Sequence, residues 1–435
     1  MKKTVKNLTR LFLLAGIIGG IQPLLKAQFS LEAQIRPRTE YRNGFKQLVT
    51  EDAESAFFVS QRSRLNALYK KDKVQLGISF QDVRVWGDQP QLAASSNQLM
   101  VHQAWAAYLI NDHLKFKLGR QELVYDDARI LGNVDWAQQA RSHDLALLTY
   151  EQNFKLHIGA AYNQQEERLL GTDYQIANNY KTMQFAWFHK KFDHWNLSLL
   201  VLNNGWQHDY ITDEVEKYKT VFSQTLGGRF SYLHKAFRFN AASYFSTGKD
   251  ANDRALAAYY FAADANYKAN SNWNFSLGWE YLSGTSELEK LNNEDYTNKS
   301  FNPYYGTNHK FNGYMDYFYV GNHINSVGLS DVFLSAKYQQ TKWNLQGALH
   351  FFSAANEVLN QDVINALEAM PNKLGTEFDL VYSYQLSPQV ALSAGYSQIF
   401  GTKTLEMLKG GDADTANNWA WLMINFNPKL IQELF

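Results

Sequence analysis

The stretch SLEAQIRPRTEYR, Ser30 to Arg42, indicates the fold class because two kinds of side chain alternate along it. Every second residue from Ser30 onward is polar or charged, and every second residue from Leu31 onward is largely apolar. A period of two is typical of a β-strand whose two faces meet different surroundings. The stretch therefore predicts an amphipathic strand. Its polar face meets either bulk water outside the protein or a wet interior.

The residues before this strand have the layout of a secretory signal peptide. The cationic start MKKTVKNLTR carries no acid, the short apolar run LFLLAGIIGGI follows, and an Ala27–Gln28 junction ends the segment. Because this run is too short to anchor in a bilayer, we expect residues 1–27 to be a signal peptide and residues 28–435 to form the mature domain. The alternative is a short buried helix. The chain has no Cys, so an exported form must close its fold without disulfides.

The composition is rich in aromatic residues and balanced in charge. There are 26 Tyr, 28 Phe and 11 Trp but only 7 Pro, and 42 basic residues offset 42 acidic ones. This balance gives no argument for a nucleic-acid partner. No apolar stretch after residue 27 approaches the roughly 20 residues that a spanning helix needs. The chain is therefore either soluble and all-β, or it meets lipid through strands alone.

Alternation recurs along the chain and predicts about 18 strands. In 273–283, for example, Trp273, Leu277 and Tyr281 share one face, whereas Asn274 and Glu280 lie on the other. Short connections such as KKDK, INDH and EQN alternate with long ones such as 120–141, 204–221 and 284–328.

These alternating connections predict an all-β fold, a transmembrane antiparallel β-barrel with short periplasmic turns and long extracellular loops. Aromatic residues at the ends of apolar strand faces fit the interface girdles of such a barrel. A soluble sandwich would not need so regular an alternation of turn lengths. Pro37 requires a local bulge or a position near the rim, since a closed barrel has no free edge.

An 18-stranded barrel encloses a bore wide enough for water and solute, so its lining decides the function. Arginines cluster early in the chain and none follows Arg254, whereas late inward positions include acids. We therefore expect a cationic wall from the early strands opposite a more acidic one. Guanidinium groups suit transient binding of a carboxylated chain; alternatively, they pair with lumenal acids and stiffen the barrel. The expected lining comprises Arg36, Arg38, Arg62, Arg64, Arg84, Arg120, Arg129, Arg141, Glu377 and Asp379, with Arg42, Glu280 and Asp331 also on these walls.

Residues 118–148 read LGRQELVYDDARILGNVDWAQQARSHDLALL: a G-R-Q-E-L pattern, an acidic pair before Arg129, then Trp136, Arg141 and Asp144. Together with GTNHKFNGYMDYFY (306–319) and NWAWLMINFNPK (418–429), this pattern resembles the alginate-export family of outer-membrane barrels. The resemblance implies an 18-stranded channel whose Arg-lined constriction conducts an anionic uronate polymer. By position, Arg120, Arg129, Arg141 and Asp144 would belong to that constriction.

The direction of two of these side chains stays open. Strict alternation from Lys115 and Lys117 points Arg120 outward, so a bulge near Gly119 is needed to turn it inward. Alternation in 142–150 is weak, which leaves the direction of Asp144 undecided.

Other chemistry has weaker support in the sequence. No HExxH or G-x-S-x-G motif is present, and we expect His189 to lie alone on the outer face, so we expect no enzyme and no cofactor. The Asp126–Asp127 pair and GGDADT (410–415) suit either Ca²⁺ in outer loops or ordinary turns. Loop 284–328 could fold inward as a constriction, and its aromatic residues suit either sugar stacking or loop packing.

Two functional classes therefore remain for this expected outer-membrane protein of a Gram-negative bacterium. One is a channel for anionic saccharides, with lipid, the saccharide and periplasmic secretion or uptake proteins as its partners. The other is a non-conducting structural or adhesive barrel. Conductance separates the two classes.

Overall fold

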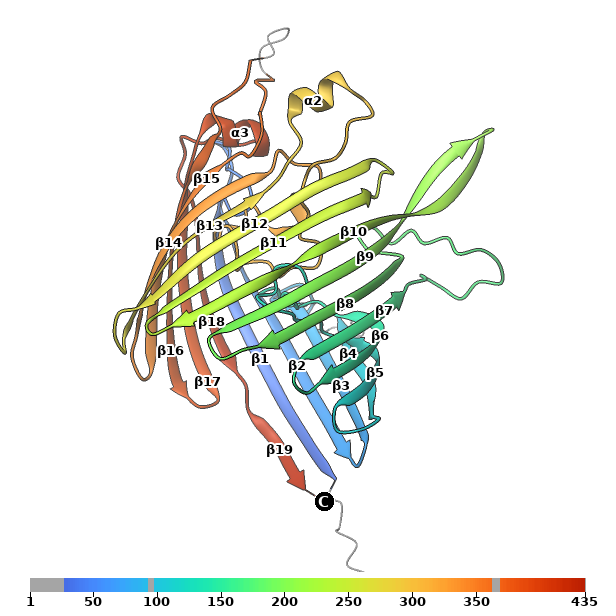
Figure 1. Cartoon of the computed structure of the whole chain (residues 1–435). Helices are drawn as coiled ribbons and strands as arrows, with labels where there is room; N and C mark the ends of the chain where they lie inside the picture. Colours follow the sequence, from blue (N-terminus) through green and yellow to red (C-terminus); the bar gives the residue numbers. More distant parts are fainter. Residues whose placement is uncertain (1–26, 93–97, 362–367, 435) are drawn as a thin grey trace, which may run out of the picture.

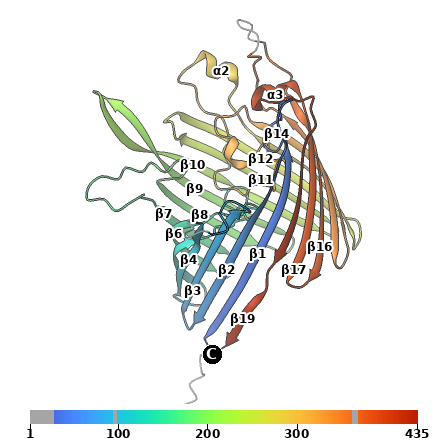
Figure 2. The same ribbon diagram turned by 180° about the vertical axis from the view of Figure 1, so that it is seen from behind.

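The computed structural model describes residues 27–92, 98–361 and 368–434, and it shows one closed, antiparallel β-barrel (Figures 1 and 2). The signal peptide predicted for residues 1–27 lies outside the described residues, apart from Ala27. The strands are β1 (Gln28–Asn43), β2 (Ala56–Lys71), β3 (Val74–Val85), β4 (Leu99–Leu109), β5 (Leu114–Gln121), β6 (His143–Glu151), β7 (Lys155–Tyr162), β8 (Thr182–Lys191), β9 (Trp195–Thr212), β10 (Val215–His234), β11 (Phe237–Lys249), β12 (Ala255–Lys268), β13 (Trp273–Leu282), β14 (Leu329–Gln339), β15 (Trp343–Ser353), β16 (Lys373–Ser387), β17 (Val390–Gly401), β18 (Asn417–Phe426) and β19 (Lys429–Leu434).

The barrel closes because both of its last two strand segments pair with β1. Ile35 to Asn43 pair with β18, and Gln28 to Glu32 pair with β19. The two segments therefore form one strand that is interrupted at Pro428, a residue without a backbone N–H. Counted this way, the 19 segments make the predicted 18-stranded barrel.

The connections alternate in length, as the sequence predicts, with two exceptions, at β9–β10 and at β11–β12, where only residues 250–254 join the strands. Two to four residues join β2 to β3, β4 to β5 and β8 to β9, whereas residues 122–142, 283–328 and 354–372 form long loops at the opposite end. The prediction of a loop over 204–221 is wrong, because β9 and β10 continue as a hairpin and turn at residues 213–214. This hairpin projects beyond the rim (Figure 1).

The two faces of the wall follow the predicted alternation. On β13 the side chains of Trp273, Phe275, Leu277 and Trp279 are exposed on the outside, whereas Glu280 is buried inside. Aromatic residues stand at both ends of this outer apolar band, for example the stacked pair Trp273 and Phe275 near the short turns. The apolar face is therefore the lipid face, and the polar face of β1 points into the lumen.

Pro37 fits into β1 without the bulge that the sequence suggested. Its pairing with Gln61 of β2 continues in register, whereas the ladder to β18 skips both Arg36 and Pro37 between Ile35 and Arg38. The missing N–H is thus accommodated by a local gap in the ladder to β18.

Gly119 lies in β5 at φ +116°, opposite Trp105. The pairing of β5 with β4 and β6 keeps its register through this residue, so the bulge expected there is absent from β5 as described. A β-carbon at Gly119 would lie 2.4 Å from the carbonyl oxygen of Ala104.

Replacing Gly119 by Ala is expected to lower the stability of the barrel by about 1–3 kcal/mol, because the backbone conformation and the close contact both exclude a side chain. The temperature at which the folded barrel loses its fast electrophoretic mobility measures this change. Gly347→Ala is the matched control, since the nearest atom to its β-carbon is 3.8 Å away. Equal midpoints for the two variants would contradict the prediction.

Helical segments occur only in the connections of the described chain: α2 (Glu287–Asn292), η1 (Val320–Asn322) and α3 (Lys403–Lys409). Ser286 caps α2 and Thr402 caps α3 through their side-chain oxygens. No helix among the described residues is long and apolar enough to cross a membrane.

Candidate functional site: the barrel lumen

Two loops fold into the middle of the lumen: residues 122–142, the β5–β6 loop, and residues 283–328, the β13–β14 loop. They meet where the backbone N–H of Gly132 donates to the carbonyl of Tyr305 at 2.8 Å. The Trp136 ring also stacks on His309, with centroids 4.0 Å apart. Leu131, Met315 and Tyr317 are buried with them. The β13–β14 loop therefore does fold inward, and it packs against the β5–β6 loop as one body.

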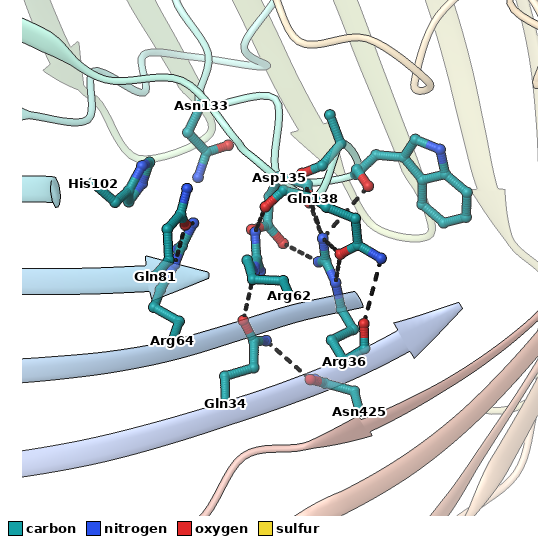
Figure 3. Close-up of polar contacts among 12 residues, drawn as sticks. Gln34, Arg36, Arg62, Arg64, Gln81, His102, Asn133, Asp135, Gln138 and Asn425 are labelled. Atoms are coloured by element: carbon teal, nitrogen blue, oxygen red, sulfur yellow. Dashed lines mark hydrogen bonds and ion pairs between the residues drawn. The ribbon is translucent and has the colours of Figure 1, made fainter. Parts of the chain in front are cut away.

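The β5–β6 loop lies on the early arginines, with Asp135 as its anchor (Figure 3). Arg36 donates to the Asp135 carboxylate at 3.2 Å and to its backbone carbonyl at 2.8 Å, and Arg62 donates to the other carboxylate oxygen at 2.8 Å. Gln138 accepts from Arg36 at 3.0 Å. Both guanidinium groups are buried, with Arg36 4% and Arg62 1% exposed. They hold the loop to the wall.

Arg38 and Arg64 also point inward and have partners within the protein. Arg38 donates to Glu40 at 2.9 Å and to the Trp136 carbonyl at 2.7 Å, and its guanidinium lies 4.1 Å from the centre of the Trp136 ring. Arg64 donates to Gln81 at 2.6 Å and lies 3.8 Å from Glu122. Loop residues and wall residues thus occupy the guanidinium groups of these early arginines.

The acidic wall on the opposite side is covered in the same way. Arg129 of the β5–β6 loop donates to Glu280 at 3.0 Å and to Asn312 at 2.8 Å. His350 lies 2.9 Å from Asp331. Further along, Ser397 donates to Asp379 at 2.5 Å, and Glu377 accepts from the backbone N–H of Met315 at 2.7 Å. Arg129 and Glu377 are thus buried contacts between loops and wall, whereas Asp379 is buried against the neighbouring strand β17.

Replacing Arg129 by Ala is expected to destabilise the barrel strongly. Its side chain and that of Glu280 are 2% and 6% exposed, and breaking a buried pair on one side costs about 3–5 kcal/mol. The double variant Arg129→Ala/Glu280→Gln should recover part of this loss, because no unpaired charge stays buried. Thermal unfolding of the folded barrel measures both changes. Arg84→Ala, at an exposed pair, should change little, and a loss as large as that of Arg129→Ala would contradict the prediction.

Two cavities lie on either side of this inward body. The loop-side vestibule, of about 800 Å³, is bounded by Arg141, His143, Trp206 and Tyr304 among others. The short-turn chamber, of about 750 Å³, is bounded by Asp127, Lys191, Arg229, Arg238 and Lys268 among others. Between them, Arg229 pairs with Asp127 of the β5–β6 loop, and Lys310 donates to the Asp127 carbonyl at 2.6 Å.

Cations predominate at the inward positions of β5–β14 on the short-turn side. Each lies an even number of residues from a buried lumenal residue of its own strand: Arg229 from Thr225, for example, and Arg238 from Ala242. Inward carboxylates of these strand segments are Glu151 and Asp264. The inward cations are Lys115, Lys117, Lys155, Lys191, Arg229, Arg238, Lys268 and Lys337.

Three residues predicted to line the lumen occupy outward positions on their strands. Arg84 pairs with Gln61, next to the inward Arg62, so it lies on the outer face, where it bonds Asp82 at 2.7 Å. The prediction that Arg84 lines the pore is wrong. Arg120 and Asp144 also occupy outward positions and pair with each other at 2.6 Å, but at the rim, where they border the loop-side vestibule.

Two further expectations concern His189 and the outer loops. His189 stacks on Trp187, which is buried inside the barrel, so the expectation that it faces outward is wrong. Asp127 pairs with Arg229, and Trp187 donates to Asp126 at 3.1 Å. In 410–415, Asp414 pairs with Lys403 at 2.9 Å. In the described part of the chain, no group of three His, Asp or Glu residues is placed to hold a metal ion.

Arg141 lies where the β5–β6 loop returns to β6, and it borders the loop-side vestibule. It donates to the carbonyl of Gly306 at 2.9 Å, and burial lowers its pKa to about 10. At neutral pH it therefore remains a cation on the floor of the vestibule.

The family of the chain is established by comparison with known proteins. A family model described as alginate export matches residues 27–415. No curated protein matches the chain. Among solved structures, OccAB4 of Acinetobacter baumannii is 12% identical, with 94% of this chain and 100% of that chain covered and a TM-score of 0.60. OccK8 (OprE) of Pseudomonas aeruginosa is 10% identical over 93% and 98%, also at 0.60. The outer membrane protein OpdK of Pseudomonas aeruginosa is 10% identical over 92% and 99%, at 0.55.

At these identities the solved structures show a shared fold, a closed barrel of the same size as this one. The family match covers most of the chain and agrees with the motifs at residues 118–148, 306–319 and 418–429. The protein is thus an outer-membrane channel of a Gram-negative bacterium, and it belongs to the alginate export family.

Proposed function

We propose that this channel prefers anions and passes anionic saccharides such as uronate oligomers or polymers. The observation that carries the proposal is the charge of the short-turn chamber. Three carboxylates border it, from Asp126, Asp127 and Asp193, against five cations, from Lys191, Arg229, Lys235, Arg238 and Lys268. Several spaced cations bind a polyanion at many weak sites, which permits both entry and release. Arg238 and Lys268 are exposed to the chamber and available to a solute.

The predicted lining residues have two different roles in this proposal. Arg36, Arg38, Arg62 and Arg64 fix the β5–β6 loop, so they shape the passage rather than meet the solute directly. Arg141 borders the loop-side vestibule, but its side chain donates to the carbonyl of Gly306. We therefore assign the ion selectivity of the channel to strands β10–β12, and chiefly to Arg229, Arg238 and Lys268.

The competing function is a non-conducting structural or adhesive barrel, and the two loops that fill the middle of the lumen favour it. Single-channel recording in planar bilayers tests the choice. An open channel whose reversal potential in a KCl gradient shows anion preference, and whose current is blocked by oligouronate, is the expected result. No conductance, or a preference for cations, would overturn the proposal.

A further inference from the structure

We propose that the loop-side vestibule is a saccharide-binding subsite that recognises hydroxyl groups and sugar-ring faces rather than charge. The inference rests on the proposed function in one respect, that a saccharide reaches the barrel. It adds a second site, on the loop side of the inward loops, and a different recognition chemistry. Such a site would bind neutral and anionic sugars alike.

The aromatic surface of the vestibule is the first observation. Trp206 of β9 and Tyr304 of the β13–β14 loop stack with centroids 6.2 Å apart and planes 21° apart, and both side chains are half-buried. Both border the same cavity of about 800 Å³. The Tyr304 hydroxyl is fixed by Ser223 at 3.3 Å, so the platform is held in place. A rigid aromatic surface in a concave site is suited to the apolar face of a pyranose ring.

The second observation is a set of buried polar atoms that lack a hydrogen-bond partner and belong to residues bordering the vestibule. They are Nε2 of His143 and the Oδ1 atoms of Asn308 and Asn325. His143 is 5% exposed, and its other ring nitrogen lies 3.0 Å from the Tyr180 hydroxyl, which fixes the orientation of the ring. Buried polar groups almost always have hydrogen-bond partners. Hydroxyl groups, which both donate and accept, suit this mixed set.

The third observation is the charge of the vestibule. Arg120 and Asp144 neutralise each other at 2.6 Å, and Asp250 accepts from Asn298 at 2.9 Å. Asp209 accepts from Gln207 at 2.8 Å, and Arg141 donates to a backbone carbonyl. The charged groups are thus nearly balanced and already engaged. The vestibule differs in this respect from the cationic short-turn chamber.

The two chambers therefore divide recognition between them. The short-turn chamber selects by charge, and the vestibule selects by hydroxyl pattern and ring shape. A solute that satisfies both, such as a uronate chain, would meet hydroxyl-recognising groups at one end of the passage and cations at the other.

Mannotetraose and the tetramer of mannuronate, added separately to each side of a planar bilayer, test the inference. We expect neutral mannotetraose to interrupt the current from the loop side. In Trp206→Ala/Asn308→Ala, residence of the sugar should fall at least tenfold, with the reversal potential unchanged. Trp86→Ala, at an outer-face tryptophan, is the matched control and should bind like the wild type.

Calorimetry on the folded barrel in detergent separates this inference from the proposed function. Binding of mannotetraose that is lost in Trp206→Ala/Asn308→Ala supports the subsite, even if the barrel does not conduct or prefers cations. No binding of mannotetraose to the wild-type barrel, or equal binding by the double variant and Trp86→Ala, would overturn the subsite whatever the conductance. Gel mobility confirms that each variant is folded.

Discussion

The double variant Arg238→Glu/Lys268→Glu is expected to change an anion-preferring channel into a cation-preferring one. Both side chains are exposed in the short-turn chamber, on neighbouring strands β11 and β12, and neither has an ion pair among the described residues. The substitutions therefore change the charge without breaking a structural contact. Arg229 would be a poorer choice, because a Glu there would face Asp127.

The size of the effect follows from Coulomb's law. A unit charge acts on an ion about 10 Å away with about 0.4 kcal/mol in water, and the double variant changes the chamber by four units of charge. The sum of about 1.7 kcal/mol exceeds the 1.4 kcal/mol that corresponds to a factor of ten. The ratio of anion to cation permeability should thus fall by about tenfold or more, measured from the reversal potential in a KCl gradient.

Lys217→Glu/Lys373→Glu provides the same change of charge at exposed residues of the loop end. Its reversal potential should stay close to that of the wild type. If the chamber variant folds and its reversal potential is also unchanged, the short-turn chamber does not set selectivity. High salt should weaken the difference between the variants, since the screening length shortens to about 3 Å at 1 M.

Alternation predicted the barrel, because lipid on one side and a polar lumen on the other impose a period of two on every spanning strand. The same alternation assigns Arg84 to the outer face together with Phe80. The clustering of arginines early in the chain favoured a lumenal position for Arg84, but clustering does not say which face of a strand a side chain occupies. Alternation likewise assigns Arg229 and Arg238 to the inner face.

The hairpin of β9 and β10 was missed for a physical reason. Beyond the rim, both of its faces meet water, so residues 204–221 carry no apolar period and read as a loop. The loop contacts could not be read from the sequence at all. Arg36 and Asp135 are 99 residues apart, and the inward course of the β5–β6 loop follows no period that would bring them together.

Asp135→Ala is expected to release the β5–β6 loop from the barrel wall and to increase the single-channel conductance. The substitution leaves two buried guanidinium groups, Arg36 and Arg62, without their countercharge. Breaking a buried pair costs about 3–5 kcal/mol, and the cost here should lie at or below the lower end because 52% of the Asp135 side chain is exposed. The barrel wall keeps its own hydrogen bonds, so the loop should move while the barrel stays folded.

The pH dependence of the wild type provides an independent test of the same contact. Burial raises the pKa of Asp135, but Arg62 and Arg36 outweigh it, so the pKa lies below the usual range. When folding lowers the pKa of a carboxyl group, the group stabilises the fold at pH values above its pKa in the unfolded chain, about 3.9. This contribution is lost as the pH falls through the lower pKa of the folded state.

The conductance of the wild type should therefore rise in acid toward that of Asp135→Ala. The conductance of Asp135→Ala should rise less in acid, because the variant has no carboxyl group at this position to protonate. Asp52→Ala, in the exposed β1–β2 loop, should behave like the wild type at every pH. Equal conductance of Asp135→Ala and the wild type at pH 7 would show that the β5–β6 loop stays in place without this anchor. The passage would then have to run beside the loop, because the remaining contacts of Arg38 with Trp136 and of Arg129 with Glu280 would suffice to hold it in the lumen.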